Sequence, residues 1–294
     1  MSRSIALLGT GLMGLPMARC LIAAGWQLTV WNRNAEKAAP LAAEGAKVAA
    51  SPAEAVRGAS HVITMLTDGN VVESVLFEQG VAEALAPGAC VIDMSSIKPS
   101  QARDHALRLA GRNIRHLDAP VSGGTKGAEA GTLAIMAGGE EAVFEEAKPI
   151  LDAMGRAIRV GPSGSGQLAK LANQAIVGIT IGAVAEATLL VSEGGGDLEA
   201  FRAALKGGFA DSTILQQHGA RMEAGDFTPG GRVNVQIKDL DNILAEADDL
   251  DIELPLVRTI RDRFVRLAGS LGGGDLDHSA LFLELLDLND RSAS

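Results

Sequence analysis

The start of the chain places the tightest limit on its fold, because a short apolar run leads into three glycines spaced Gly-x-Gly-x-x-Gly. Residues 5 to 8, Ile-Ala-Leu-Leu, indicate a buried strand, and Gly9, Gly11 and Gly14 follow. In such a strand, turn and helix, the three glycines respectively allow a tight turn, close approach of a pyrophosphate and close helix packing. The helix start then offers N–H groups and a positive dipole end to phosphates. The context predicts a dinucleotide-binding unit rather than an ordinary glycine turn.

The end of the next predicted strand, residues 27 to 31, bears on which dinucleotide would bind. Asn32 and Arg33 stand about where this fingerprint places an acid for the ribose 2′-hydroxyl. An acid would repel a 2′-phosphate, whereas a guanidinium can hold it through a forked pair of hydrogen bonds. We therefore predict NADP(H) in preference to NAD(H). The alternative is a solvated Arg33 in a loop.

Short apolar segments alternate with amphipathic ones as far as residue 162, which is typical of a doubly wound sheet. Further strands are predicted at 61–66, 90–94, 114–119, 133–137 and 158–160. Helices are predicted at 52–57, 71–85 and 140–154. Residues 1–162 are therefore expected to form an α/β Rossmann-type domain that binds NADP.

The pattern changes after residue 162. Residues 163–192 contain no proline and are rich in Ala, Leu, Ile and Val, which predicts a bridging helix roughly 43 Å long at about 1.5 Å per residue. Residues 193–294 are expected to form an all-α domain for substrate binding and oligomerisation, with helices at 197–206, 212–224, 234–249, 255–268 and 279–286. The bridging helix is apolar on several faces, so a homodimer or homotetramer is expected to cover part of it.

Composition narrows the possible partners and compartment. The formal net charge is −10 and no long basic run occurs, which speaks against nucleic acid or anionic lipid as a partner. Cys20 and Cys90 are the only cysteines and form no CxxC pair, which fits a reducing compartment. No signal-like start or charge-free membrane-spanning run is found. A cytoplasmic protein without a membrane partner is expected.

Several kinds of chemistry are disfavoured by what the sequence lacks. There is no tyrosine, so the Tyr/Lys acid pair of many short reductases is excluded. The five histidines are scattered along the chain, without the close spacing typical of a zinc site, so no metal is expected. His116 lies near a predicted strand end, where it could act as a base or serve a structural role.

Two segments carry candidate chemical groups. Lys170 and Asn173 are three residues apart early in the bridging helix, so they share one face. An ammonium in an apolar helix needs partners or a cleft, although a lysine with its head in water fits equally well. Ser122, Gly123 and Gly124 follow a predicted late strand, where a turn could present a hydroxyl and N–H groups to a carboxylate. An ordinary loop is the alternative there.

Four motifs together resemble the β-hydroxyacid dehydrogenases, the family of 3-hydroxyisobutyrate dehydrogenase and tartronate semialdehyde reductase. They are the glycine-rich start at residues 9–17, Asp118 to Gly124, Gly166 to Asn173, and Lys238-Asp239-Leu240, and the resemblance covers nearly the whole chain. The chain departs from the family pattern at Cys20, where the family usually has Asn. That position lies off the phosphate turn, so the change bears on helix packing.

The resemblance implies a role for each matched position. Lys170 would be the catalytic lysine, Asn173 would orient the substrate, and Ser122, Gly123 and Gly124 would anchor the substrate carboxylate. The implied cofactor site consists of Gly9, Gly11, Leu12, Met13, Gly14, Asn32, Arg33, Met65, Leu66, Ser96 and Lys238.

The implied activity is an NADPH-dependent reduction of small semialdehyde or keto acids, equally written as 3-hydroxy acid oxidation. A hydride that reaches a carbonyl carbon leaves negative charge on the oxygen, which a lysine ammonium both stabilises and protonates. Tartronate semialdehyde is the first expected substrate, followed by methylmalonate semialdehyde and succinic semialdehyde.

Two alternatives remain beside this expectation. An imine reductase on the same scaffold is one, although those relatives commonly replace the helix lysine. A non-catalytic NADP-binding sensor is the other, but it would need neither Lys170 nor the Ser122 turn. Decarboxylating relatives that act on phosphorylated sugar acids carry a much larger helical domain than this chain has.

Overall fold

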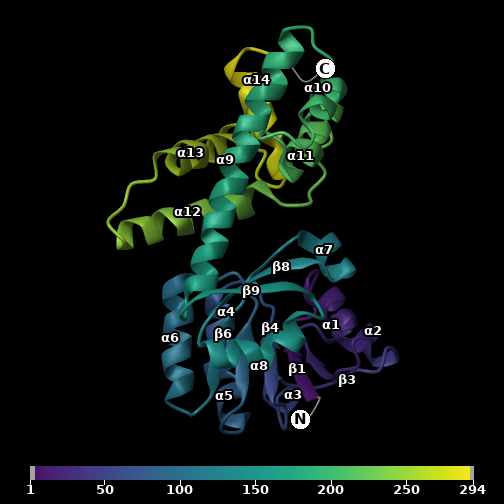
Figure 1. Ribbon diagram of the computed structural model, residues 1–294, viewed down its shortest axis with the longest axis vertical. Coiled ribbons are helices and arrows are strands. Elements are labelled where there is room, and N and C mark those ends of the chain that lie inside the picture. The colour runs from purple at the N-terminus through teal and green to yellow at the C-terminus, as the bar shows by residue number, and fades with distance from the viewer. Residues whose placement is uncertain (1–3, 292–294) are drawn as a thin grey trace. The chain divides into compact units, whose positions relative to one another are not determined.

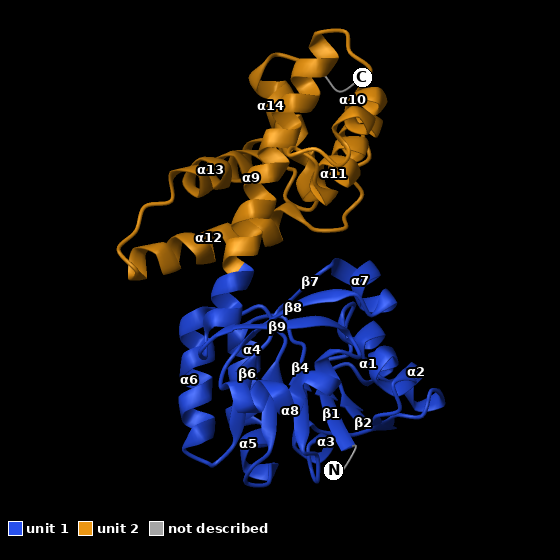
Figure 2. Cartoon of the chain, viewed as in Figure 1, with its two compact units in different colours: residues 1–170 blue, residues 171–294 orange. Residues whose placement is uncertain are grey.

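The computed structural model describes residues 4–291, which divide into two compact units (Figure 2). The first unit ends at Lys170 and the second begins at Leu171. Helix α9 (Ser165–Glu193) runs without a break across this boundary. The bridging helix expected at 163–192 is therefore present, and its first turns belong to the first unit, whereas the sequence placed the domain boundary near residue 162.

The first unit is built on a nine-stranded sheet in the order β3-β2-β1-β4-β5-β6-β8-β7, with β9 beside β8 (Figure 1). Its strands are β1 (Ser4–Leu8), β2 (Gln27–Trp31), β3 (Lys47–Val48), β4 (His61–Thr64), β5 (Cys90–Asp93), β6 (Arg115–Asp118), β7 (Val121–Ser122), β8 (Leu133–Gly138) and β9 (Gly155–Gly161). Its helices are α1 (Gly14–Ala23), the 3-10 helix η1 (Ala35–Lys37), α2 (Ala39–Ala43), α3 (Pro52–Ala55), α4 (Gly69–Glu73), the π-helix η2 (Ser74–Glu78), α5 (Val81–Ala84), α6 (Pro99–Ala110), α7 (Gly124–Ala130) and α8 (Glu141–Leu151).

Two apolar cores cover the two faces of this sheet. Successive residues of β1 alternate between them, since Ile5 and Leu7 belong to one core while Ala6 and Leu8 belong to the other. The first core is completed by α1, α2 and α8, and the second by α3, the α4–η2–α5 segment and α6. Strands β3, β2, β1, β4, β5 and β6 pair in parallel. Together these features confirm the expected doubly wound Rossmann-type fold.

The local predictions differ from the structure in a few places. The helix expected at 71–85 is three short elements, α4, η2 and α5. Gly80 adopts a left-handed conformation (φ 76°) directly before α5 and separates it from η2. The strand expected at 158–160 is longer, because β9 pairs with β8 from Gly155 onward. Cys20, which stands where the family usually has Asn, donates a weak hydrogen bond to the carbonyl oxygen of Ala128 (Sγ to O, 3.3 Å). This hydrogen bond connects α1 to α7.

The named elements in the described residues of the second unit are all helices, which confirms the expected all-α region. After α9 its elements are α10 (Leu198–Leu205), α11 (Thr213–Ala224), α12 (Val233–Asp249), α13 (Pro255–Ser270), the 3-10 helix η3 (His278–Ala280) and α14 (Leu281–Leu288). Its core includes Ile181 and Val184 of α9, Leu240 of α12 and Phe264 of α13.

Helix α9 is the one helix among residues 4–291 that is long and apolar enough to cross a membrane, judged by length and composition. The core helix of a globular domain can pass the same test. Ile181 and Ala185 are fully buried in the second unit, so the middle of α9 serves as such a core helix. The absence of a membrane partner remains a prediction.

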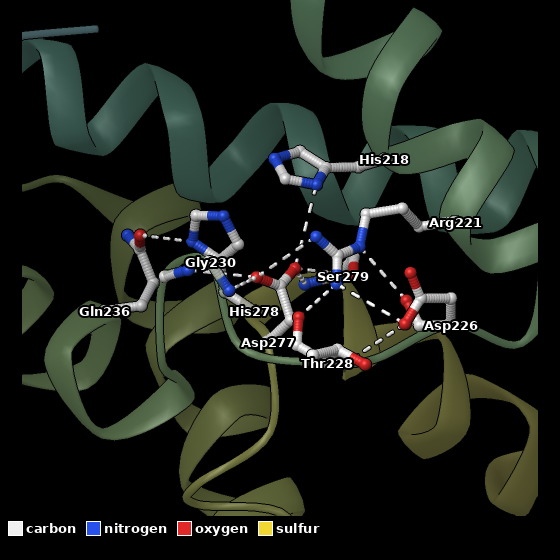
Figure 3. Close-up of polar contacts among 10 residues, drawn as sticks. His218, Arg221, Asp226, Thr228, Gly230, Gln236, Asp277, His278 and Ser279 are labelled. Atoms are coloured by element: carbon white, nitrogen blue, oxygen red, sulfur yellow. Dashed lines mark hydrogen bonds and ion pairs between the residues drawn. The ribbon is translucent and has the colours of Figure 1, made fainter. Parts of the chain in front are cut away.

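The buried carboxylate of Asp277 ties residues 277–279 to the loop at residues 230–231 of the second unit (Figure 3). Asp277 Oδ2 accepts hydrogen bonds from the backbone N–H groups of Gly230 (2.8 Å) and Gly231 (2.9 Å). Its Oδ1 accepts from the backbone N–H (3.1 Å) and the hydroxyl (2.7 Å) of Ser279. Burial alone would raise the pKa of Asp277, but the bonds from Gly231, Ser279 and Gly230 outweigh burial and lower the pKa to about 2.

Two histidines that are distant in the sequence lie beside this carboxylate. One ligand atom each from His218, Asp277 and His278 lies within 4.8 Å of the others, a proximity that the scattered histidine pattern did not predict. The Asp277 oxygens are already occupied by the four N–H and O–H donors, and Arg221 Nη1 lies 3.8 Å from Asp277 Oδ2. A divalent cation would have to displace those donors beside a guanidinium, so the cluster is explained as an anchor of the fold.

The anchor generates a stability prediction. The Asp277→Ala change leaves buried N–H donors without acceptors and should lower the free energy of unfolding by about 3 kcal/mol. The matched control is Asp275→Ala, because the Asp275 side chain is 83% exposed and forms a surface ion pair with Arg232; its expected effect is below about 0.5 kcal/mol. Urea unfolding followed by circular dichroism compares the two, and equal losses would contradict the anchoring role.

Candidate active site

The carboxyl ends of the central parallel strands are aligned. Leu8 pairs with Thr64, Thr64 with Asp93, and Asp93 with Asp118, so the last residues of β1, β4, β5 and β6 form one row. The segments that follow these strands therefore leave the sheet along one edge. In open α/β sheets, ligands bind at this edge.

A cleft of about 630 Å³ opens in this part of the first unit. Its lining includes most of the predicted cofactor residues: Gly9, Gly11, Leu12, Met13, Gly14, Asn32, Arg33, Met65 and Leu66. Ser96 lies in the same unit on the loop after β5, and Lys238 belongs to the second unit. Lys37 and Asn70 also line the cleft, and the sequence reasoning did not select either of them.

The glycine turn shows why these positions lack side chains. A Cβ on Gly14 would lie 1.8 Å from the carbonyl oxygen of Gly9, so α1 can pack onto the turn only with glycine there. Gly9 itself adopts φ 105°, a left-handed conformation. A Cβ on Gly11, by contrast, would meet no described atom within 4 Å. Gly11 therefore borders open space, as a residue that faces a pyrophosphate should.

The end of β2 is connected to this turn. Asn32 Oδ1 accepts the backbone N–H of Thr10 (3.0 Å), and Asn32 Nδ2 donates to the carbonyl of Asn34 (2.9 Å). Arg33 and Lys37 are exposed at the cleft, and neither forms an ion pair with any residue of the described range 4–291. Some other arginines of this unit are paired, such as Arg19 with Glu44 and Arg112 with Glu83. Two cationic side chains that form no ion pair with a described residue therefore line the cleft.

The loops after β4 and β5 are cross-linked by buried side chains. Ser95 Oγ accepts the backbone N–H of Leu66 (2.9 Å). Asp93 Oδ1 accepts from Thr64 Oγ1 (2.7 Å) and from the backbone N–H of Ser95 (3.0 Å). Burial raises the pKa of Asp93 to about 6 despite these hydrogen bonds. The predicted cofactor residues Leu66 and Ser96 therefore lie in loops that are held together.

A second buried carboxylate fixes the beginning of α9. Asp118 at the end of β6 has no exposed surface, and it accepts the backbone N–H groups of Gly164 (Oδ1, 2.7 Å) and Gln167 (Oδ2, 2.9 Å). Burial raises the pKa of Asp118, while those hydrogen bonds oppose the shift. Lys170 lies one turn after this attachment and is partly buried. The candidate catalytic lysine is thus carried by a helical turn that is tied directly to the sheet.

The Ser122 turn differs in detail from the expected loop. Ser122 ends the short strand β7, and Gly124 begins α7. Gly123 (φ 131°) and Gly124 (φ 61°) both adopt conformations that favour glycine. Ser122 is partly exposed and both glycines are exposed, so the turn remains accessible to a ligand.

The second unit brings two further candidates together. Asn173 Nδ2 donates to Gln174 Oε1 (2.9 Å), Gln174 Nε2 donates to Asp239 Oδ2 (2.8 Å), and Lys238 Nζ lies 3.4 Å from Asp239 Oδ1. A chain of polar contacts therefore links Asn173 to Lys238. Sequence reasoning selected its two ends and missed Gln174 and Asp239, although Asp239 stands inside the Lys-Asp-Leu motif.

His116 fits the structural role better than the role of a base. It is 7% exposed, and neither ring nitrogen has a hydrogen-bond partner within the described part of the chain. Burial lowers its pKa to about 3. It lines a separate cavity near α6 and α8 rather than the cleft at the glycine turn.

Comparison with known proteins agrees with this architecture. Residues 4–161 match the family model of the NAD binding domain of 6-phosphogluconate dehydrogenase. Residues 164–285 match a model described as NAD-binding of NADP-dependent 3-hydroxyisobutyrate dehydrogenase. The chain is 44% identical to 2-hydroxy-3-oxopropionate reductase of Escherichia coli K12 over 287 residues, which cover 96% of this chain and 97% of that protein.

Solved structures show the same likeness. A Mycobacterium tuberculosis 3-hydroxyisobutyrate dehydrogenase with L-serine superimposes with a TM-score of 0.88 at 32% identity, covering 97% of this chain and 99% of that one. A Streptomyces aurantiacus imine reductase has a lower TM-score of 0.63 at 26% identity, covering 96% of this chain and 99% of the reductase.

A Rossmann-type sheet with an accessible glycine turn, followed by a helical unit, defines an NAD(P)-dependent oxidoreductase. Within that class, the chain belongs to the β-hydroxyacid dehydrogenase family. This membership makes the chain an enzyme, so the non-catalytic sensor considered from the sequence is set aside.

The glycine turn yields a prediction with an internal control. Gly14→Ala should lower thermal stability, because its Cβ clashes with the Gly9 carbonyl. Gly11→Ala should unfold like the parent protein but bind NADPH at least about tenfold more weakly, because its methyl group would occupy the space of the pyrophosphate. Differential scanning fluorimetry and fluorescence titration separate these outcomes. If Gly11→Ala bound NADPH as tightly as the parent protein does, the pyrophosphate would not lie at this turn.

Proposed function

We propose that this protein is an NADP(H)-dependent reductase of small semialdehyde acids, with tartronate semialdehyde as the first-choice substrate. The observation that carries the proposal is the likeness along nearly the whole chain to the E. coli 2-hydroxy-3-oxopropionate reductase. Methylmalonate and succinic semialdehyde are the next candidates. The M. tuberculosis relative with L-serine adds 3-hydroxy acids, in the oxidative direction, to the compounds worth testing.

The preference for NADP(H) rests on Arg33 and Lys37. Both are exposed cations at the cleft and form no ion pair with a described residue. A guanidinium that is not engaged by a carboxylate can hold a 2′-phosphate through two parallel hydrogen bonds. The start of α1 lies in the same cleft and supplies N–H groups for the pyrophosphate.

The proposed chemistry assigns one task to each candidate residue. When bound, the nicotinamide supplies the hydride. Lys170 donates a proton to the carbonyl oxygen as negative charge develops there, and accepts it back in the oxidative direction. Ser122, Gly123 and Gly124 bind the substrate carboxylate, and Asn173 orients the reacting group. Lys238 completes the cofactor site at the nicotinamide end.

An imine reductase would differ from the proposed carbonyl reductase in its proton donor. Imine reduction needs a proton donor suited to a nitrogen, and the sequence retains Lys170 instead of the replacements common in those relatives. The likeness to the S. aurantiacus imine reductase is also lower, at 26% identity. We therefore retain carbonyl reduction as the proposed activity.

We further propose a cytoplasmic homodimer or homotetramer. Within the second unit, Ile176 and Leu190 of α9 are 66% and 76% exposed, and Phe209 is fully exposed. Large apolar side chains exposed on a helical unit are candidates for subunit contacts. Light scattering at micromolar concentration measures the assembly, and a monomer would contradict this part of the proposal.

Arg33→Asp should discriminate between the cofactors. Loss of the guanidinium and gain of a carboxylate should reduce kcat/KM for NADPH by about 10–100-fold, while kcat/KM for NADH stays within about threefold. Arg57→Asp is the control, because it makes the same charge change at an exposed position outside the cleft. The assay follows cofactor oxidation with a panel of C3 to C5 semialdehydes and keto acids. Equal losses for both cofactors would refute the 2′-phosphate contact.

Lys170→Ala tests the proposed acid. Removal of the ammonium should reduce kcat by about 10²–10⁴-fold and leave NADPH affinity nearly unchanged. Lys148→Ala is the control, because Lys148 pairs with Asp152 on the exposed side of α8. Stopped-flow turnover and NADPH titration give the two quantities. Near-normal turnover in Lys170→Ala would end the assignment.

A further inference from the structure

Gln167 is a polar side chain in an almost completely buried position. It is 1% exposed, and both ends of its amide are used. Its Oε1 accepts the backbone N–H of Ile97 (3.1 Å), and its Nε2 donates to the backbone carbonyl of Ser95 (2.7 Å). Its own backbone N–H donates to Asp118 Oδ2 (2.9 Å).

The two backbone groups held by this amide flank Ser96, one of the predicted cofactor residues. The Gln167 side chain therefore acts as a clamp across the loop after β5. The same loop reaches the neighbouring one, because Ser95 Oγ accepts the backbone N–H of Leu66, which lines the cofactor cleft. Lys170 follows Gln167 by three residues, so it lies on the next helical turn of α9.

We propose that Gln167 is a positioning residue, which locks the helical turn that carries Lys170 to the loop that carries Ser96. The proton donor and the cofactor loops then keep one fixed geometry during hydride transfer. This inference rests on the proposed catalytic role of Lys170. All of the contacts that carry it lie within the first unit.

The hydrogen-bond pattern favours a geometric function over a purely stabilising one. Asp118 already attaches the helix to β6 through two backbone N–H groups, and Gly164 and Gln167 both contribute to that attachment. The side-chain amide of Gln167 adds a contact to the loop after β5, whereas the Asp118 bonds attach the helix to β6. The turn is thereby held from two strands, which fixes its rotation as well as its distance. An offset of about 1 Å in a reacting group can cost on the order of 10²-fold in rate.

The first test is Gln167→Met, which keeps the side-chain length and removes both amide hydrogen bonds. The expected kcat falls by about 10–100-fold, while the substrate KM and the Kd for NADPH change by less than about threefold. The kinetic isotope effect with 4-deuterated NADPH should rise, because misplacement slows hydride transfer relative to product release. An unchanged kcat and isotope effect would overturn the inference and leave Gln167 a part of the fold only.

A control separates positioning from general loosening of the structure. Gln216 Nε2 donates to the carbonyl of Arg202 (3.3 Å) and to Asp211 Oδ1 (2.8 Å), in a half-buried site of the second unit. Gln216→Met should lower thermal stability without changing kcat or the isotope effect. If Gln216→Met reproduces the kinetic changes of Gln167→Met, the kinetic changes reflect stability and the inference fails.

Gln167→Glu offers a pH-dependent rescue. A protonated carboxyl can donate to Ser95 and accept from Ile97 as the amide does, whereas the ionised form can only accept. Burial and the carboxylates of Asp118 and Asp93 raise the pKa of such a glutamate, while Lys170 on the same helix lowers it. The ratio of variant to parent kcat should therefore increase as the pH falls. A ratio that stays low at every pH and does not rise on acidification would contradict the role of the bond to Ser95.

Lys170→Ala, measured alongside Gln167→Met, separates a failure of the proposed function from a failure of the positioning role. Retained turnover in Lys170→Ala refutes the proposed function whatever Gln167 does. Loss of turnover in Lys170→Ala together with parent-like kinetics in Gln167→Met refutes only the positioning role.

Discussion

One buried carboxylate determines where the long helix starts relative to the sheet. Asp118 is inaccessible to solvent, and a charge in that position is costly unless donors surround it. The fold supplies them from the first turn of α9, whose unpaired N–H groups and positive dipole end favour an anion. Two glycines make room for this arrangement, since a Cβ on Gly138 would lie 2.6 Å from Asp118 Oδ1 and one on Gly166 would lie 2.5 Å from the Asp118 carbonyl oxygen. The helix can therefore approach the strand end closely enough for the carboxylate to cap it.

Several other candidates of the first unit lie in segments that leave the sheet along this edge. Because β1, β4, β5 and β6 end in register, strand pairing brings together the glycine turn, the Met65-Leu66 loop and the Ser96 loop. The Asp118 side chain attaches the start of α9 to the same edge. Side-chain hydrogen bonds from Ser95, Asp93 and Gln167 then fix the loops against one another. The register of the parallel strands therefore places the loops of the candidate site near one another. The buried polar groups then hold these loops in place.

Sequence patterns predicted those features that depend on local spacing. The glycine turn, the parallel sheet and the long helix each have a period or a motif that can be recognised without tertiary knowledge. Gln167 has no such period or motif, because a glutamine on an apolar helix is expected at the surface. Its burial depends on the loop 95–97, which is far away in the chain.

The same limit applies to His218, which meets Asp277 and His278 only after α11 and η3 fold together. Gln174 and Asp239 were missed because their contact joins α9 to α12. The glycine break at Gly80 was a local signal, but the surrounding apolar residues masked it.

The net charge of −10 raises the question of how an anionic cofactor and an acidic substrate would be attracted. At physiological ionic strength, charges are screened beyond about 8 Å, so the balance near the cleft matters more than the total. Much of the positive charge in the first unit is neutralised locally, as in the contacts of Arg115 with Glu146 and of Arg108 with Glu73. Arg33 and Lys37 form no ion pair with a described residue, and both line the cleft. Two cations without a carboxylate partner beside a glycine turn add positive potential where a phosphate would bind, even though the net negative charge of the chain repels anions.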